Sequence, residues 1–366
     1  MYLDFATTRG NAGLTDKQLS ALMIGDEAYA GSANFFALEQ ACREVFGKQF
    51  TVPTHQGRGA EHLILRGLLT PGQALATNGN LGTLQPLADE LGLHVETLPA
   101  EDAFDPRSQT EFKADPPLDR LNDLCESGRI KLLLLGAALP HLGGQPLSLD
   151  TLRECASLAR RHGVPLALDA SMIASAAYLD KLRRHPTEDL QALIRRYADQ
   201  CDILYLSGRE DAGCHTGGLI ATNHEDHYST FRSLVVVYEG LHTYGGQAGR
   251  DMQALAQGLR DMRDESYLAF RARKLAYLAE HVEAAGYDIY RPLGLSGVCL
   301  DGRAAPVGGL PDPDSPQGLF APASADIAAL LYLVSGIRLR PMSGPMFECA
   351  LDLLGICVPR RCYTEK

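Results

Sequence analysis

The sequence predicts an α/β fold with a mostly parallel sheet, and three observations support it. Short apolar runs at 131–135, 165–168 and 202–206 have the length and composition of buried strands. Segments with the spacing of amphipathic helices lie between them, at 149–162 and up to about residue 198. Strands that alternate with helices pair in parallel, because each helix returns the chain to the same end of the sheet.

The N-terminal part of this fold is expected to be helical in two pieces. Thr15 can cap a helix whose first turn contains Asp16, and a second helix begins near Asn34. The segment VPTHQGRGAE at 52–61 is a glycine-rich turn that leads into a further helix. Such a helix N-terminus exposes backbone N–H groups that suit an anion, although a plain tight turn explains the glycines equally well.

The middle of the chain supplies the predicted strand ends. Gly163 ends the helix at 149–162, and Thr187 can cap the next helix, which runs to about Ala198. The run at 165–168 is followed directly by Asp169. Ligands of doubly wound sheets bind at the carboxyl ends of the strands, so we expect Asp169 to lie at a binding site.

The loop LSGREDAGCHTGG at 206–218 lies between two predicted strands and carries most of the candidate chemistry. It follows the buried run at 202–206, and a second apolar run begins at Leu219. A polar loop between central strands is a common position for an active site.

The chain is long enough for two domains. We expect a large α/β domain at 15–260, with the pocket, and a smaller one that combines 1–14 with 286–366. A single long helix at about 251–285 is expected to connect them.

Composition narrows the class of protein. The net charge of −11 argues against a nucleic-acid partner, which requires a basic face. No apolar run is long enough to span a membrane. Nine cysteines occur without a CxxC pair, which favours reduced, buried thiols over disulfides. We therefore expect a cytoplasmic protein that acts on a small molecule.

Several collinear segments resemble the β-eliminating lyase family, which contains tyrosine phenol-lyase and tryptophanase. The resemblance rests on GDEAYAGS at 25–32, VPTHQGRGAE at 52–61, VVVYEG at 235–240 and YGGQAGRDM at 244–252, and on GGQP at 143–146, Gly217-Gly218 and PRRCYT at 359–364. It implies the aspartate-aminotransferase type of fold (pyridoxal 5′-phosphate fold type I). It also implies a homodimer or homotetramer built around pyridoxal 5′-phosphate (PLP).

The resemblance assigns roles to residues that match the family pattern. By this resemblance, the PLP phosphate is held by Gln56, Gly57, Arg58 and Ser207. Asp169 corresponds to the acid that pairs with the pyridine nitrogen and makes the ring an electron sink. Tyr29 corresponds to an acid–base tyrosine, and Glu27 to a ligand of a monovalent cation. For each position, inherited loop geometry without a role in chemistry is the alternative.

Other positions depart from the family pattern. The family's SGKKD is SGRED at 207–211, so Glu210 stands where the lysine that forms the imine is expected. By the same resemblance, Leu81 replaces the aromatic residue that stacks on the ring, and Pro140 an asparagine. Met172 replaces an arginine, and Gly355 replaces the arginine that binds the substrate carboxylate. A divergent homologue that lacks the imine-forming lysine is therefore expected.

The loss of the lysine removes the imine and the general base together. At about 4 Å and an effective dielectric constant near 20, a carboxylate repels another anion by about 4 kcal/mol. Arg209 can offset part of this repulsion at the phosphate. We therefore expect an enzyme with this fold that acts on a small amino-acid-derived or aromatic substrate without a lysine-linked cofactor, in specialised biosynthesis and independently of PLP.

Within this reading, Glu210 and His215 join Asp169 in acid–base work, or bind a divalent metal with Cys214. Adjacent residues such as Cys214 and His215 do not easily converge on one ion. Two alternatives stay open. One is a lysine-free enzyme that uses PLP or pyridoxamine phosphate, with His215 or Tyr29 moving protons. The other is a non-catalytic partner subunit.

Overall fold

The computed structural model describes residues 3–6, 13–79, 83–302, 324–342 and 351–358, and a seven-stranded sheet lies at its centre. The spatial order of the strands is β2 (Phe50–Thr54), β10 (Gly218–Thr222), β9 (Ile203–Ser207), β8 (Leu166–Asp169), β5 (Ile130–Gly136), β3 (Ala74–Thr77) and β4 (His94–Thr97). From β9 to β4 the neighbours are parallel, whereas β10 is antiparallel to both β9 and β2. The predicted α/β class with a mostly parallel sheet is confirmed.

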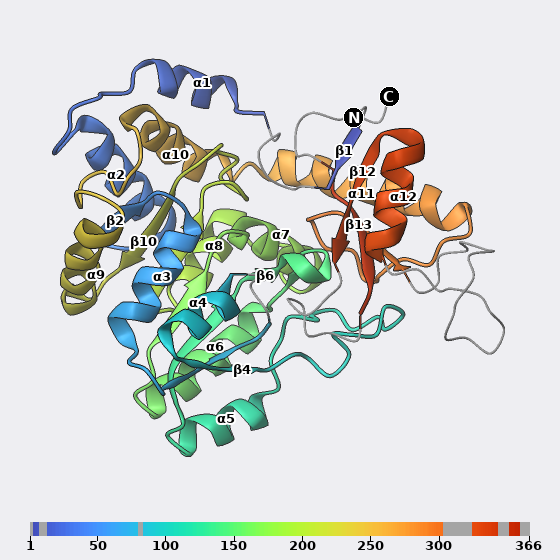
Figure 1. The fold of residues 1–366 in the computed structure, drawn as a ribbon, viewed down its shortest axis with the longest axis horizontal. Helices are drawn as coiled ribbons and strands as arrows, with labels where there is room; N and C mark the ends of the chain where they lie inside the picture. The colour runs from blue at the N-terminus through green and yellow to red at the C-terminus, as the bar shows by residue number, and fades with distance from the viewer. Residues whose placement is uncertain (1–2, 7–12, 80–82, 303–323, 343–350, 359–366) are drawn as a thin grey trace.

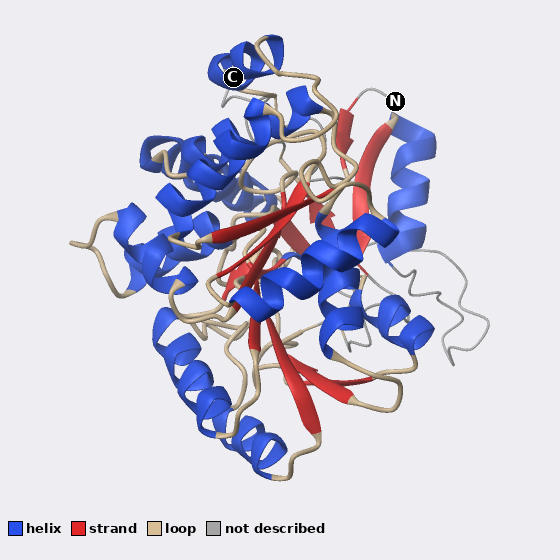
Figure 2. Cartoon of the chain, turned by 90° about the vertical axis from the view of Figure 1, so that its left-hand side faces the viewer, coloured by secondary structure: helices blue, strands red, loops and turns tan. Residues whose placement is uncertain are grey.

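Helices cover both faces of this sheet (Figure 2), because successive residues of a buried strand point to opposite sides. Leu132 and Leu134 of β5 belong to one apolar cluster, and Leu133 and Leu135 belong to another. The first cluster is completed by α3 (Gly57–Leu68), α4 (Leu84–Leu91) and α9 (Glu225–Tyr238). The second is completed by α2 (Ala33–Phe46), α5 (Leu118–Glu126), α6 (Leu149–Arg161), α7 (Ile173–Arg183), α8 (Leu190–Ala198) and α10 (Gly249–Asp261).

The predicted helix boundaries are confirmed where side chains cap the helix. Thr15 Oγ1 accepts the Gln18 N–H at 2.9 Å at the start of α1 (Asp16–Met23), and the Gln18 side chain accepts the Thr15 N–H in return. After α6, Gly163 adopts a positive φ of 65°, as expected of a glycine just beyond a helix end.

Two predicted helices differ from the structure. The helix expected after Thr187 begins at Leu190 instead, because Asp189 caps it by accepting the Ala192 N–H at 2.9 Å. The single helix expected at 251–285 is two helices, α10 and α11 (Glu265–Ala284). The side chain of Asp264 accepts the Tyr267 N–H at 3.2 Å and so starts a new helix. Helical spacing alone does not reveal this internal cap.

A second sheet of four strands lies to one side of the central sheet (Figure 1). Its order is β1 (Leu3–Phe5), β12 (Ile337–Met342), β13 (Leu353–Ile356) and β11 (Val298–Asp301), and α12 (Ser324–Ser335) packs against it. The sheet therefore joins the N-terminal strand to strands from beyond residue 286, the segments grouped in the smaller domain. The domain boundaries themselves stay a prediction.

In the described ranges, no helix is long and apolar enough to cross a membrane. The seven cysteines within these ranges are all free and buried.

A buried ion pair connects the loop after β9 to two helices. Asp211 accepts hydrogen bonds from the backbone N–H and the hydroxyl of Ser175 in α7, at 2.8 and 2.6 Å. The Arg271 guanidinium of α11 lies 3.6 Å from Asp211 and also donates to the carbonyl of Leu295. Both charged side chains are almost inaccessible to solvent, so their pairing offsets part of the cost of burying each charge.

We predict that Arg271→Met lowers the free energy of unfolding by about 3–5 kcal/mol, because it removes a buried positive charge that pairs with the Asp211 carboxylate. Urea unfolding followed by circular dichroism measures the change. Arg273→Met, at an exposed position of the same helix, is the matched control and should cost less than about 0.5 kcal/mol. Equal losses in both variants would contradict a stabilising role for the pair.

Candidate functional site

The candidate site lies where β8 and β9 end side by side. Asp169 is the last residue of β8 and Ser207 is the last residue of β9. The two strands are parallel, with Asp169 opposite Tyr205. Their carboxyl ends therefore meet at one edge of the sheet, as the sequence predicts for Asp169.

Ser171 fixes these two strand ends relative to each other. Its hydroxyl donates to Asp169 Oδ1 at 2.5 Å, and its backbone N–H donates to the same oxygen at 2.9 Å. The Ser171 hydroxyl also accepts the Ser207 N–H at 2.8 Å, and its carbonyl accepts the Asp211 N–H at 3.0 Å. One serine thus orients the carboxylate and positions both ends of the segment that carries Glu210. The sequence reasoning missed it.

The N-terminus of α3 faces the same strand ends. A Cβ atom on Gly57 would lie 2.8 Å from the Cβ atom of Ser207, so only glycine permits this approach. Gln56, at the N-cap, makes no side-chain cap hydrogen bond to this described helix. The Gln56 side chain therefore does not occupy the first N–H groups of α3. An anion site requires such uncapped N–H groups.

Arg58 and Arg209 add positive charge to the α3 terminus, because both line the cavity at the strand ends. Within the described part of the chain, Nε of Arg209 is buried and has no hydrogen-bond acceptor. A buried donor without an acceptor is costly, and an anion in the cavity would satisfy it.

Glu210 lies in the loop after β9 and is 2% exposed. Its backbone N–H approaches the carbonyl of Ser207 at 3.4 Å, and its own carbonyl accepts the Gly213 N–H at 3.1 Å. Three effects act on the pKa of the Cys357 thiol. Burial and the negative charge of Glu210 raise this pKa, with burial the larger effect, and the positive guanidinium of Arg340 lowers it. Glu210 and Arg340 therefore both lie near this thiol, on the side of the four-stranded sheet.

These groups line one small cavity together with residues that the sequence reasoning did not select. The lining residues are Gln56, Gly57, Arg58, Glu61, Thr83, Pro140, Asp169, Ser171, Tyr205, Ser207, Arg209 and Glu210. No lysine is among these described residues. The cavity volume of about 100 Å³ is below the roughly 300 Å³ at which ordinary ligand sites begin. A ligand larger than an anion such as phosphate therefore requires lining side chains to move.

Glu61 is the most perturbed of the missed residues. Thr83 Oγ1 donates to one carboxyl oxygen, and Tyr205 donates to the other at 3.2 Å. Burial raises the pKa of Glu61 to about 7, and the nearby Asp169 charge contributes in the same direction. Glu61 precedes the buried residues Ile64 and Leu65 by three and four positions, so all three lie on the buried face of α3. This spacing was visible in the sequence.

Three predicted site residues do not reach the cavity. His215 is exposed, although it was expected beside Asp169. Its neighbour Cys214 turns inward, where Gln18 Nε2 lies 3.3 Å from its sulfur. Tyr29 is 73% exposed, with its ring 5.4 Å from that of Tyr244, and Glu27 accepts the Arg250 N–H at 3.3 Å. His215 is therefore not among the described residues that line the cavity with Asp169 and Glu210, and its expected acid–base role stays a prediction.

The metal hypothesis gains no support from these positions. The described ranges contain no group of three His, Cys, Asp or Glu side chains that could hold a metal ion. Cys214 and His215 diverge because one side chain packs inward and the other faces solvent.

Other expected departures from the family pattern are partly located. Pro140 lines the cavity, and buried Met172 precedes α7 as its N-cap. Leu81 and the PRRCYT segment at 359–364 lie outside the described residues. Gly355 lies in β13, directly opposite Arg340 of β12.

Arg340 places a guanidinium one strand away from the position where the family arginine was expected. A Cβ atom on Gly355 would lie 3.6 Å from the Cβ atom of Arg340, so the two positions are in direct contact. Burial lowers the pKa of His141 to about 4, and Arg340 contributes to the shift. His141 directly follows Pro140, a lining residue of the cavity, so the positive charge of Arg340 acts on a neighbour of the cavity lining.

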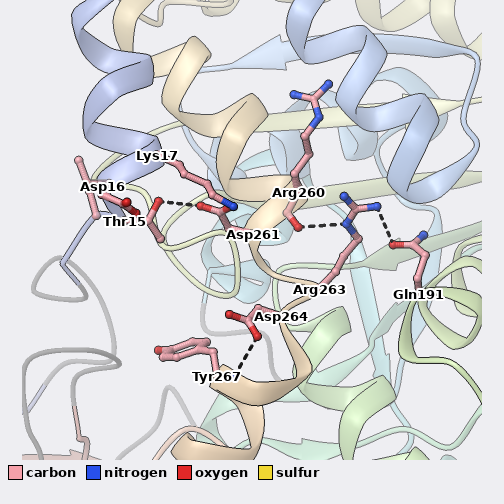
Figure 3. A pocket seen from close by; sticks show the side chains of 10 residues that line it. Thr15, Asp16, Lys17, Gln191, Arg260, Asp261, Arg263, Asp264 and Tyr267 are labelled. Atoms are coloured by element: carbon pink, nitrogen blue, oxygen red, sulfur yellow. Dashed lines mark hydrogen bonds between the residues drawn. The ribbon is translucent and has the colours of Figure 1, made fainter.

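A second cavity of about 680 Å³ lies between α1, α8 and the junction of α10 and α11 (Figure 3). Its charged groups are mixed in sign, and several are already paired. Thr15 donates to Asp261 at 2.7 Å, and Arg263 donates to Gln191 at 3.3 Å. No strand end is among its described lining residues, so the smaller cavity at Asp169 is the candidate functional site despite its size.

The raised pKa of Glu61 generates a testable pH dependence. The unfolded carboxyl ionises above about pH 4.5, whereas the folded one ionises only near pH 7, so stability falls as pH rises through this window. We compare the free energy of unfolding of Glu61→Gln with that of the unmodified protein. As pH rises from 5 to 8, this difference should shift by about 2–3 kcal/mol in favour of the variant. Urea unfolding at the two pH values measures this. A constant difference between the proteins would show that Glu61 ionises normally.

Comparisons with known proteins identify the family of the chain. The sequence profile described as "Beta-eliminating lyase" matches residues 4–342. Tyrosine phenol-lyase of Symbiobacterium sp. (strain SC-1) is 37% identical over 381 residues, covering 100% of this chain and 81% of that protein. Tyrosine phenol-lyase of Nostoc punctiforme is 34% identical over 382 residues, with 100% and 80% coverage.

Among solved structures, serine palmitoyltransferase of Sphingomonas wittichii superposes with a TM-score of 0.67 at 13% identity, over 99% of this chain and 83% of that one. At this identity the likeness shows only the fold, which is that of PLP enzymes of fold type I. The profile match and the relatives above 30% identity extend over nearly the whole chain. The chain therefore belongs to the β-eliminating lyase family.

Proposed function

We propose that this protein is an enzyme of the β-eliminating lyase family that acts on a small amino-acid-derived or aromatic substrate without a lysine-linked cofactor. The observation that carries the proposal is Glu210, which lines the strand-end cavity and is 2% exposed. By resemblance it occupies the position of the imine-forming lysine, and the described lining residues offer no other lysine. A carboxylate forms no imine, so chemistry that begins from a lysine adduct is not open to this pocket.

The remaining residues fit part of PLP, the cofactor of this fold type. The α3 N-terminus, Arg58 and the buried Nε of Arg209 suit a phosphate group. Asp169, held by Ser171, suits a protonated pyridine nitrogen. When bound, PLP supplies an electron sink to its enzymes. Glu210 stands where the family has the lysine amine that would react with the PLP aldehyde. The residues therefore fit the phosphate and the pyridine nitrogen but not a covalent link to the cofactor.

Within the cavity, proton transfer is assigned to Glu210. Its carboxylate is the buried group that replaces the family base, and it can accept a proton from a carbon or nitrogen atom of the substrate. Glu61, whose pKa is raised to about 7, also lines the cavity and can exchange a proton near neutral pH. Tyr29 and His215 lie on exposed surface in the single chain, so they receive no role in the cavity.

Two alternative functions remain for this cavity: non-covalent binding of a vitamin B6 phosphate by a lysine-free enzyme, and no catalytic use in a partner subunit. The unsatisfied Nε of Arg209 favours a lysine-free enzyme that binds a vitamin B6 phosphate non-covalently. A non-catalytic partner subunit would have no need to bury both Glu210 and Glu61, since buried carboxyls are costly. The first alternative is therefore preferred to the second.

We also propose that the protein forms a homodimer at least. Val236, Val237 and Tyr238 of α9 are exposed apolar side chains in the segment that resembles a subunit-contact region of the family. Light scattering at micromolar concentration should report at least twice the chain mass of 39.6 kDa. A mass of one chain would contradict the proposal.

The lysine-free chemistry predicts a clear spectroscopic result. Protein incubated with PLP should show no imine band near ~420 nm, and borohydride should leave no pyridoxyl group on a lysine of the pocket. Mass spectrometry of peptides measures the adduct. A reducible adduct on a pocket lysine of the unmodified protein would refute the proposed function.

Glu210→Lys is expected to gain a borohydride-reducible PLP adduct at position 210, because it removes the carboxylate and supplies the amine in one change. It should not release phenol from tyrosine, since by resemblance Leu81 replaces the aromatic residue that stacks on the ring and Gly355 replaces the arginine whose contact with the substrate carboxylate is worth about 1.5–3 kcal/mol. Arg58→Ala in the Glu210→Lys background is the control and should weaken the gained binding. Tyrosine turnover near the rate of the family would contradict the prediction.

A further inference from the structure

We propose that Arg340 binds a carboxylate group of the substrate and thereby makes the protein selective for an acidic ligand. This inference rests on the proposed function, since it assumes that the strand-end cavity is the substrate site. It deepens that function by naming the chemical class of the substrate and the residue that recognises it.

Arg340 belongs to a row of residues that crosses the four-stranded sheet. Arg340 of β12 and Cys299 of β11 both lie directly opposite Gly355 of β13. Residues paired in this way point to the same face of a sheet, and Cys357, two positions after Gly355, shares that face. The glycine places no side chain between Arg340 and the two thiols.

The guanidinium of Arg340 is surrounded by uncharged groups. It donates a hydrogen bond to the Cys357 thiol, and burial raises the pKa of this thiol above its ordinary value. Burial also raises the pKa of Cys299 to about 12 and lowers the pKa of His141 to about 4, and the charge of Arg340 acts on both groups. All three side chains are therefore neutral near pH 7, so none of them balances the positive charge.

The carboxyl groups that act on the same thiol do not pair with Arg340 either. These groups are Asp4 and Glu210. Asp4 Oδ2 lies 3.6 Å from the guanidinium of Arg338, the other arginine of β12. Within the described ranges, Arg340 forms no ion pair with a carboxyl group, although its side chain is only partly exposed. A half-buried cation without a counter-charge is costly, and an anionic ligand group would offset this cost.

The row faces a segment that begins at the candidate cavity. A Cβ atom on Gly143 would lie 3.2 Å from the sulfur of Cys299. Pro140, three residues before Gly143, lines the cavity, and so does Glu210, which acts on the Cys357 thiol. A ligand that extends out of the cavity past Pro140 and Glu210 therefore meets this row.

A carboxylate is the anion that suits this position, because a planar guanidinium can donate two parallel hydrogen bonds to its two oxygens. The contact differs from the one that the family resemblance assigns to the position of Gly355. Neighbouring strands lie about 4.8 Å apart, so a guanidinium from β12 is displaced from that position toward the far side of the row. We therefore expect the acidic group of the substrate on the β12 side, where a substrate held as in the family does not place it.

The test is isothermal titration calorimetry of the dialysed full-length protein at pH 7.5 with 3-phenylpropionate and with its amide, 3-phenylpropionamide. The amide is the matched control ligand, because it has the same size and lacks the negative charge. We expect the acid to bind at least about tenfold more tightly than the amide. In Arg340→Met this ratio should fall below about threefold, with the affinity for the amide unchanged.

Arg338→Met is the matched control variant, because it removes an arginine of the same strand that is already paired with Asp4. It should preserve the ratio. Arg340→Gln is a second test variant, since it keeps a hydrogen-bond donor for the Cys357 thiol, and it should lower the ratio as Arg340→Met does. Circular dichroism of each variant shows whether the fold is retained.

Two outcomes overturn the inference. One is binding of the acid by the unmodified protein that is no tighter than binding of the amide, including a failure of both probes to bind at millimolar concentration. The other is a preference for the acid that survives in either folded variant of Arg340, which would assign it to another residue. The proposed function fails instead if borohydride traps a pyridoxyl–lysine in the pocket. The two failures are therefore distinguishable.

Discussion

The hydroxyl of Ser171 is the contact on which the candidate site depends. It donates to Asp169 at the end of β8 and accepts from the backbone of Ser207 at the end of β9. Parallel strands bring their carboxyl ends to one edge of a sheet, but they do not fix the relative height of the two ends. A short hydrogen-bonding side chain between them does so. The approach of α3 follows from this arrangement, since Gly57 packs against Ser207.

Much of this arrangement could be predicted from sequence because it depends on local patterns. The strand that ends at Asp169 was visible as an apolar run, and the capping box at Thr15 was visible from residue type and spacing. The break between α10 and α11 was not, because Asp264 could equally have been a polar residue inside a helix. Local preference decides an element where nothing distant competes with it.

The site residues that sequence reasoning misplaced depend on distant contacts. His215 faces solvent because Cys214 packs inward against Gln18, a residue about 200 positions away in the chain. No pattern within the loop specifies that contact. Glu61 was overlooked although its spacing placed it on the buried face of α3, and its partners Thr83 and Tyr205 come from other segments. Such a network is recognisable only when the segments are assembled.

The glycines around the loop after β9 determine which of its positions can vary. A Cβ atom on Gly208 would lie 2.8 Å from Leu255, one on Gly217 2.8 Å from Gln247, and one on Gly218 2.5 Å from the backbone of Gln56. Asp211 is equally constrained by its buried ion pair. Arg209, Glu210 and His215 lie between these fixed points and face the cavity or solvent. Evolution can therefore exchange the reactive side chain at this site and leave the supporting backbone unchanged.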